Sequence, residues 1–214
     1  MTLLALNLAG TFAFGLSGAL AAIRARLDIF GVFVLAAVVG LAGGIIRDVL
    51  IGIRPIALRD WYYLAAVGAA AAVVLLAHPE LERVRRPIDV MDAAGLSLFC
   101  VTGAIAGLEA GFGAPEAVIL GVLTGIGGGI LRDVLLGKVP VVFRRGLYAV
   151  PALVGAAIVV VAYRAGARDL GFAVAGAATC FALRLAGLRF NLDLPTPAPV
   201  SKRLRGLRPR PEPR

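Results

Sequence analysis

The sequence predicts an all-α polytopic membrane protein with seven transmembrane helices, arranged as two inverted three-helix repeats followed by a seventh helix. Three observations predict it: an apolar composition, a regular alternation of uncharged runs with charged loops, and a repeat of this pattern after 85 residues. The chain has 214 residues, of which 60% are hydrophobic and 16% are charged, and 27 are glycine. Soluble domains are about 45–50% apolar and about 25% charged, so this composition indicates a lipid bilayer.

Seven uncharged runs are the candidate spans. They are Met1–Ile23, Ile29–Ile46, Trp61–His78, Ala93–Leu108, Ala117–Leu131, Gly146–Tyr163 and Leu170–Leu183. A helix of about 20 residues crosses the hydrocarbon core, which is about 30 Å thick, so the shorter runs must continue past a charge at one end. The last run continues past Arg184 and Arg189, which must reach the headgroups or pair within the protein. The first run follows no basic segment and ends in no cleavage site, so we expect a retained helix.

The distribution of basic residues predicts the orientation. With the N-terminus outside, the cytoplasmic loops hold eight Lys or Arg and the outer loops hold four. The cytoplasmic set is Arg24, Arg26, Arg83, Arg85, Arg86, Lys138, Arg144 and Arg145, and the outer set is Arg54, Arg59, Arg164 and Arg168. Because basic loops stay in the cytoplasm, we expect the N-terminus outside and the C-terminus inside.

An internal repeat relates the two halves of the chain. A shift of 85 positions places GGIIRDVLIG, which begins at Gly43, on GGILRDVLLG, which begins at Gly128. Nine of the thirteen positions from Gly43 to Pro55 are then identical without a gap. Chance similarity between apolar helices gives scattered Leu and Ala matches, so this shared motif indicates a duplication.

The repeat sets the predicted boundaries. We expect a first three-helix repeat at 1–79, a second at 88–164, a seventh helix at 169–190 and a basic disordered tail at 195–214. Because each repeat has three helices, the second enters the membrane from the opposite side, which is an inverted-topology repeat. The tail is rich in proline, and Glu212 is its one acidic residue. Contact with anionic lipid headgroups explains such a tail better than nucleic acid does, so we expect no nucleic-acid partner.

The Gly-Gly-x-x-Arg-Asp motif allows three interpretations. A phosphate-binding loop is disfavoured, because the motif lacks Gly-Lys-Ser/Thr and any βαβ unit. The arginine could simply mark the end of a span at the headgroups. The second copy disfavours this interpretation, because Ala117–Leu131 covers only about 22 Å at about 1.5 Å per residue. The helix must therefore carry Arg132 and Asp133 into the membrane, where charges normally face a partner, a neighbouring helix or a water-filled cavity.

The third interpretation is a pathway between the repeats. Consecutive glycines weaken a helix and permit kinks that expose carbonyl groups. They are Gly43 and Gly44 in the first repeat, and Gly127, Gly128 and Gly129 in the second. Neighbouring residues project about 100° apart on a helix. We therefore expect one charge of each pair to line the pathway and the other to pair across the repeats, as Arg47 with Asp133 and Arg132 with Asp48.

Three hydroxyl side chains are further candidates for the pathway. Ser17 and Thr102 occupy equivalent positions in the first helix of each repeat, and Thr124 precedes Gly125 in the second glycine-containing helix. Each hydroxyl could offer oxygen to a cation, or could hydrogen-bond a neighbouring helix instead. The residues Trp61, Tyr62, Tyr63 and Tyr148 follow the motif helices, where an interfacial aromatic belt explains them.

No pattern in the sequence indicates an enzyme. The two cysteines, Cys100 and Cys180, lie inside apolar runs, and the single histidine is His78. These residues do not form a metal-binding or disulfide pattern, and no nucleophile–base pair or cofactor motif is present. We therefore expect no catalytic residues, no metal and no cofactor.

The paired motifs, in a chain of two three-helix units and one further helix, resemble the prokaryotic trimeric intracellular cation (TRIC) channels. The resemblance extends over roughly Leu3 to Leu188. An allied bacterial family of putative glycine transporters shares the motif and the duplication. Where animal TRIC channels carry a Lys-Glu-Val segment that contacts a phosphoinositide, this chain reads Gly-Gly-Gly, so phosphoinositide binding is not implied.

The resemblance implies a homotrimer in the inner membrane of a prokaryotic cell, with a pore through each subunit between its two three-helix bundles. It implies conduction of potassium, with sodium as a second permeant ion. Kinks would fall at Gly43-Gly44 and Gly128-Gly129. The implied pore or gate residues are Ser17, Thr102, Arg47, Asp48, Arg132 and Asp133.

Two other functions remain open from the sequence. A secondary transporter for a small zwitterion such as glycine would use Arg for the carboxylate and Asp for the amine, and inverted repeats suit transporters as well as channels. A membrane scaffold would need the Arg-Asp pairs only for assembly.

Overall fold

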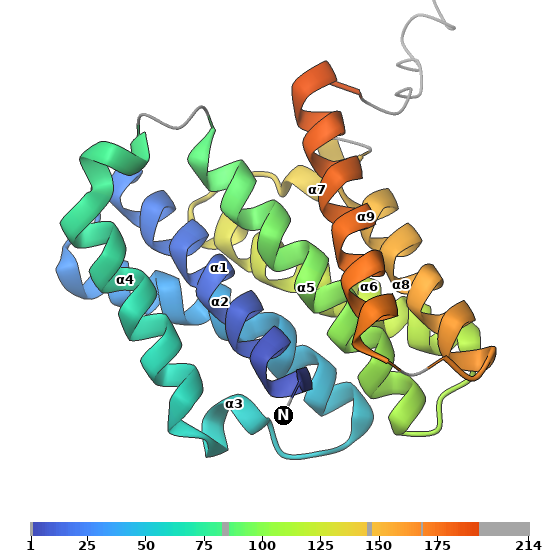
Figure 1. Ribbon diagram of the computed structural model, residues 1–214. Helices are drawn as coiled ribbons and strands as arrows, with labels where there is room; N and C mark the ends of the chain where they lie inside the picture. Colours follow the sequence, from blue (N-terminus) through green and yellow to red (C-terminus); the bar gives the residue numbers. More distant parts are fainter. Residues whose placement is uncertain (1, 83–85, 145–146, 168, 193–214) are drawn as a thin grey trace, which may run out of the picture.

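The computed structural model describes residues 2–82, 86–144, 147–167 and 169–192, and every element in these ranges is helical (Figure 1). Seven helices have 16 to 23 residues, and two have only four. The nine helices of the described ranges are α1 (Thr2–Arg24), α2 (Ile29–Ile51), α3 (Ile56–Arg59), α4 (Trp61–Glu82), α5 (Pro87–Glu109), α6 (Ala114–Leu135), α7 (Val141–Arg144), α8 (Ala149–Arg164) and α9 (Leu170–Phe190). The predicted tail at 195–214 lies outside the described residues.

The chain is a polytopic membrane protein. Five helices of the described part are long and apolar enough to cross a membrane: α1, α2, α5, α6 and α9. Two further apolar helices are shorter, namely α8 and the Trp61–Ala77 part of α4. Ala77 departs from helical geometry (φ −120°, ψ 17°), which marks a kink near the end of α4.

The helix ends follow from capping residues between the apolar runs. The Asp28 side chain accepts a hydrogen bond from the Gly31 N–H at 2.7 Å and begins α2. The Asp169 side chain accepts one from the Gly171 N–H at 2.8 Å and begins α9. Gly52, with φ 85°, ends α2 in the left-handed conformation that glycine adopts without strain.

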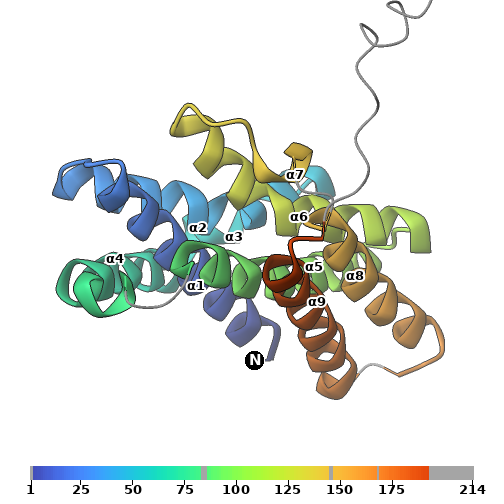
Figure 2. The ribbon, with the colours of Figure 1, turned by 90° about the horizontal axis from the view of Figure 1, so that it is seen from above.

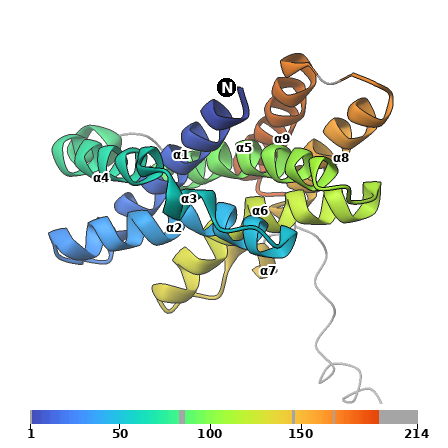
Figure 3. The same cartoon turned by 90° about the horizontal axis from the view of Figure 1, so that it is seen from below.

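The two central helices are α1 and α5, which pack against each other (Figures 1 and 2). Around them, α2 and α4 pack on α1, whereas α6, α8 and α9 pack on α5. The motif helices α2 and α6 also pack together. Figure 1 places α3 near the lower end of the bundle, the end at which the N-terminus also lies, and α7 near the upper end. Figure 3, from below, shows α3 on the near side of the bundle. The segments that follow the two motifs therefore lie at opposite ends of the molecule.

The centre of the bundle is built from contacts that recur after 85 residues. The rings of Phe14 and Phe99 meet edge to face, with centroids 5.4 Å apart. A Cβ added at Gly10 would lie 2.5 Å from the Phe99 ring, and one added at Gly95 would lie 2.5 Å from the Phe14 ring. Each ring therefore fills the space that the equivalent glycine leaves open.

The motif glycines are points of close approach between α2 and α6. A Cβ at Gly43 would overlap the Thr124 carbonyl oxygen of α6, and one at Gly128 would lie 2.5 Å from the Val39 carbonyl oxygen of α2. Both helices are helical at every residue through the glycines. The glycines therefore do not interrupt the helical backbone, and they let the two backbones come into contact; the kinks expected at Gly43-Gly44 and Gly128-Gly129 stay a prediction.

The second motif helix extends well beyond its uncharged run. The run Ala117–Leu131 is part of α6, which continues to Leu135 and carries Arg132 and Asp133 with it. These two side chains are buried, with residue exposures of 4% and 6%. The charges therefore lie inside the bundle, as the short run predicts.

Candidate functional site

The first buried polar group, named here the Arg47 cluster, consists of Asn7, Arg47, Asp48 and Tyr63. The Arg47 guanidinium donates from Nε and NH2 to Asp48 Oδ1, at 2.8 and 2.7 Å, and from NH1 to Asn7 Oδ1 at 2.7 Å. The other carboxylate oxygen, Asp48 Oδ2, accepts the backbone N–H of Ile56, the first residue of α3, at 2.8 Å. Tyr63 is buried within electrostatic reach of both charges. Asp48 thus neutralises the arginine and also anchors the chain after α2.

The second group, named here the Arg132 cluster, consists of Asp92, Arg132, Asp133 and Tyr148. Arg132 donates from Nε and NH2 to Asp133 Oδ1, at 3.0 and 2.9 Å, and from NH1 to Asp92 Oδ1 at 2.7 Å. Asp133 Oδ2 accepts the N–H of Val141, the first residue of α7, at 2.9 Å. Each of these positions follows its counterpart in the Arg47 cluster by 85 residues.

The predicted pairing across the repeats is wrong. Arg47 pairs with Asp48 and Arg132 with Asp133. Although neighbouring Cα–Cβ bonds on a helix diverge by about 100°, the arginine side chain is long enough to fold back onto the adjacent carboxylate. Both members of each pair are therefore buried together.

The candidate hydroxyls have different surroundings. Ser17 Oγ accepts a hydrogen bond from Arg132 NH1 at 2.7 Å, which links α1 to α6. Thr102, its counterpart, donates to Phe99 O at 3.4 Å and lines a cavity beside Arg47. Thr124 donates to Leu120 O of its own helix at 2.6 Å, and its side chain packs against Gly103.

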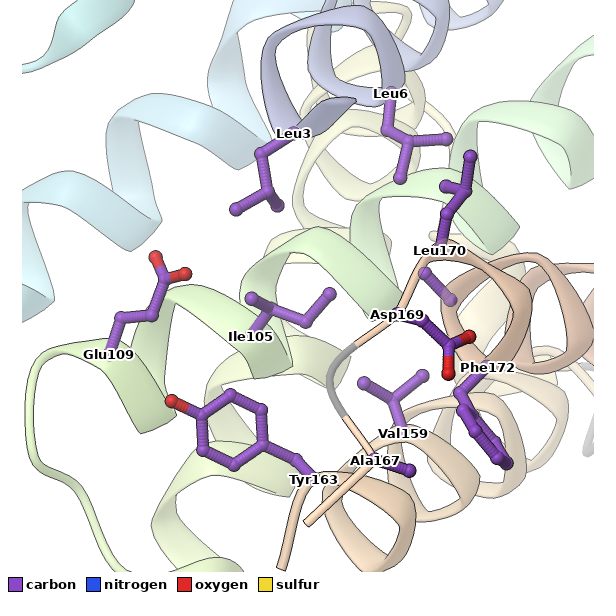
Figure 4. A pocket seen from close by; sticks show the side chains of 11 residues that line it. Leu3, Leu6, Ile105, Glu109, Val159, Tyr163, Ala167, Asp169, Leu170 and Phe172 are labelled. Atoms are coloured by element: carbon purple, nitrogen blue, oxygen red, sulfur yellow. The ribbon is translucent and has the colours of Figure 1, made fainter. Parts of the chain in front are cut away.

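Glu109 lies between two neighbouring cavities near the lower end of the bundle. One, of about 290 Å³, is lined by Asn7, Arg47, Asp48, Thr102 and Glu109, among others. The other, of about 390 Å³, lies among the ends of α1, α5, α8 and α9, and Glu109 and Asp169 face it (Figure 4). Glu109 lines both cavities. Asn7, Arg47 and Asp48 therefore line a cavity to which Glu109 adds a further carboxylate.

Gly44 borders open space inside the protein. A Cβ added at this buried residue would meet no atom within 4 Å. At its counterpart, Gly129, a Cβ would overlap the Tyr148 hydroxyl and lie 3.0 Å from Asp92 Oδ1. The space beside the first glycine motif is therefore filled by Tyr148 in the second.

Several members of the clusters were absent from the sequence-based candidates. Asn7 and Asp92 coincide under the 85-residue shift, which was the available signal. Tyr63 and Tyr148 also coincide, but the aromatic-belt interpretation is wrong for them, because both are buried. Trp61 is 66% exposed, as a belt residue would be.

Arg184 of α9 is fully enclosed. Its guanidinium lies over the Tyr148 ring, 4.6 Å from the centroid, and NH1 donates to Leu147 O at 3.0 Å. The side chain is 2% exposed. Arg184 therefore stays inside the protein, against an aromatic ring and a backbone carbonyl, and does not reach the headgroups.

Comparison with protein families gives one matching model, described as "Glycine transporter", which matches residues 4–79 and again 89–164. A UPF0126 membrane protein of Streptomyces coelicolor is 50% identical over 199 residues, which cover 91% of this chain and 90% of that protein. The UPF0126 inner membrane protein YadS of Escherichia coli is 36% identical over 198 residues, or 89% of this chain and 94% of that protein.

Solved structures with the same fold include two TRIC channels. A TRIC trimeric intracellular cation channel orthologue from Rhodobacter sphaeroides is 41% identical, with a TM-score of 0.82, over 89% of this chain and 98% of that one. A prokaryotic TRIC channel crystallised in 0.5 M KCl is 32% identical, with a TM-score of 0.83, over 90% and 98% of the two chains.

Proposed function

This chain belongs to the family of the UPF0126 membrane proteins and the prokaryotic TRIC channels, and from this premise we propose that it is a cation channel. The permeant ion is potassium, with sodium as a second. The observation that carries the proposal is the likeness to a TRIC channel at 41% identity over 89% of the chain.

The proposed architecture is seven spans, with α4 and α8 added to the five longer apolar helices. The first unit, 1–79, holds α1 to α4, the second, 88–164, holds α5 to α8, and α9 (within 169–190) stands apart. The double match of one family model, at 4–79 and 89–164, supports this division, because both limits differ by 85 residues. The positions of α3 and α7 at opposite ends support an inverted relation between the units.

The proposed pathway runs between the two units, along α2 and α6. From the lower end it enters the cavity at the Arg47 cluster and passes Thr102. It continues along the open space beside Gly44 to the Arg132 cluster. There, the hydrogen bond from Arg132 to Ser17 joins the units and holds the path closed in this conformation.

The buried arginines do not oppose cation passage in this arrangement. Arg47 is neutralised by Asp48, and Arg132 contacts both Asp92 and Asp133. Unpaired positive charge at these positions would repel cations strongly in a low-dielectric interior. Glu109 adds a negative charge to the lining of the cavity beside Arg47.

We also propose a homotrimer, since the relative from Rhodobacter sphaeroides is a trimeric channel. The basic loops place the N-terminus outside and the C-terminus in the cytoplasm. The inner membrane of a prokaryotic cell is the proposed location, as for the relative from Escherichia coli.

Currents through planar bilayers test the function. The purified chain in symmetric KCl should give discrete single-channel steps, and a KCl–NaCl gradient should give a reversal potential that favours potassium. Gly44→Leu, which fills the space on the proposed path, should lower the current. The matched control is Gly68→Leu on α4, where an added Cβ also meets no atom within 4 Å, and it should conduct normally. Equal effects of the two variants would contradict the pathway.

A glycine transporter is the second candidate, because the matching family model carries that description. The Arg-Asp pairs would then bind the carboxylate and amine of a zwitterion. Saturable glycine uptake into liposomes, driven by a proton or sodium gradient and without current steps, would favour this candidate.

A further inference from the structure

The two clusters differ in one formal charge. The first has Arg47 and Asp48, with neutral Asn7 as the third partner. The second has Arg132 and Asp133, but Asp92 replaces the asparagine. The Arg132 cluster as defined therefore carries one more negative charge than the Arg47 cluster. Because an uncompensated charge inside a membrane protein is costly, this carboxylate must either take up a proton or lie near a further cation.

The seventh helix brings a cation to the same place. Arg184 lies over one face of the Tyr148 ring, and the Tyr148 hydroxyl lies at the far end of that ring, next to Gly129 and Asp92. Both Arg132 and Arg184 are within electrostatic reach of the Asp92 carboxylate. With Arg184 included, the group has two acids and two bases, and its net formal charge is zero.

The packing of α9 fixes this position. A Cβ at Gly187 would lie 3.1 Å from the Leu147 side chain, so the glycine lets α9 come close to the start of α8. One turn earlier on α9, Arg184 then reaches Leu147 O and the Tyr148 ring. Arg184 makes no direct salt bridge in the described part of the chain, and its Nε and the Tyr148 hydroxyl are buried without a well-formed hydrogen bond. Its charge is thus held in place by stacking and by one backbone carbonyl.

We propose that Arg184 is the buried counter-charge of Asp92 and that, through the Tyr148 ring, it positions the Arg132 cluster. The helix outside the repeat thereby compensates for the Asn7-to-Asp92 difference between the repeats. Arg184 is a positioning residue, since it acts on Arg132 and Ser17 through Asp92 and Tyr148. The charge balance stands whether or not the chain conducts; only the consequence for the closed path depends on the proposed function.

A double-mutant cycle on the full chain in detergent tests the proposal. Arg184→Met removes the cation and leaves Asp92 in excess, and Asp92→Asn leaves Arg184 in excess. Each single variant should lower the melting temperature by roughly 5–15 °C, because removing one partner of a buried charge pair leaves the other charge uncompensated. The double variant restores neutrality and reproduces the composition of the Arg47 cluster, so its melting temperature should lie above that of either single variant. Additive losses in the double variant would overturn the proposal.

Two controls separate charge compensation from general packing. Asn7→Asp places the same carboxylate in the other cluster, and its effect should simply add to that of Arg184→Met. If Arg184→Met alone does not fold, the Asp92→Asn/Arg184→Met chain should still be recovered as a folded protein. Failure to recover it while Asp92→Asn alone folds would also overturn the proposal.

A functional readout separates this proposal from the proposed channel. If the chain conducts, Arg184→Met should raise the open fraction of single channels, because the Arg132–Ser17 contact loses its support. The Asp92→Asn/Arg184→Met double variant should bring the open fraction back toward that of the unchanged chain. An unchanged open fraction would overturn the positioning of the Arg132 cluster. If the chain does not conduct at all, the thermal cycle still decides the charge balance.

Discussion

At both clusters, one aspartate carboxylate serves two elements. Asp48 Oδ1 accepts hydrogen bonds from the Arg47 guanidinium, and Oδ2 accepts the first backbone N–H of α3. Asp133 does the same for α7. The two short helices are therefore tied to the ends of α2 and α6 through the same side chains that neutralise the buried arginines.

This double role predicts an order of stability among variants at Asp48. Asp48→Asn should cost about 3–5 kcal/mol, because it leaves the buried Arg47 charge without a counter-charge. Arg47→Met/Asp48→Asn should cost less, because no charge remains and the asparagine oxygen can still accept the Ile56 N–H. Denaturation of the purified variants measures both values. A double variant at least as unstable as Asp48→Asn would contradict the ion-pair argument.

The equivalent glycines 44 and 129 give a second test, because their surroundings differ. Gly44→Ala should be neutral or stabilise the chain by up to about 1 kcal/mol, since alanine favours the helix and the Cβ meets open space. Gly129→Ala should destabilise it by about 1–3 kcal/mol, because the Cβ overlaps the Tyr148 hydroxyl and Tyr148 is enclosed under Arg184. Unfolding free energies of the two variants are the measurement, and a cost at Gly44 equal to that at Gly129 would refute it.

The sequence predicted which charged residues are buried better than it predicted the residues with which they interact. Arg132 and Asp133 had to be buried because their uncharged run is short, and the structure buries them. Their mutual pairing depends on the Arg side-chain conformation, which helical spacing does not determine. The contacts of Arg184 with Tyr148 and Leu147 depend on how α9 packs against the start of α8, and this long-range packing at Gly187 leaves no local pattern in the sequence.

At the scale of helices, the crossing of α2 and α6 is the most constrained contact. Gly43 and Gly128 each face a carbonyl oxygen of the other helix. Unlike a side chain, a backbone carbonyl cannot rotate away without disturbing its helix. The glycine motif lets the two helices touch, which is typical of small residues between membrane helices; the kinks predicted at the same glycines stay a prediction.

We therefore expect Gly128→Ala to separate α2 from α6 and to cost several kcal/mol, more than the usual 1–3 kcal/mol for overpacking. Gly68→Ala on α4 is the matched control, because its Cβ meets no atom within 4 Å, and it should be neutral or mildly stabilising. Thermal unfolding in detergent compares the two. Similar melting temperatures for both variants would contradict the assigned crossing.

The helix content was predictable from the uncharged runs, but the helix ends were not. α6 extends beyond its run at both ends, to Ala114 and Leu135. The four-residue helices α3 and α7 escaped prediction because no apolar period marks them; each depends on a carboxylate acceptor from the preceding motif. The 85-residue shift could have revealed them as a pair, since Ile56 and Val141 coincide under it.

At the scale of the whole molecule, the inverted arrangement proposed for the two units predicts that equivalent loops face opposite sides of the membrane. Arg54 and Val139 occupy the same position after each motif, both are exposed, and their segments lie at opposite ends of the bundle. The native cysteines, Cys100 and Cys180, are buried, so a cysteine introduced in either loop should be the main target of a maleimide that does not cross membranes. In intact spheroplasts, the maleimide should label Arg54→Cys and should not label Val139→Cys. In opened membranes it should label both.

The opposite result in spheroplasts would reverse the proposed orientation but keep the inverted arrangement. Labelling of both variants from the same side would refute the inverted arrangement. It would also refute a pathway that the motif helices α2 and α6 enter from opposite faces of the membrane.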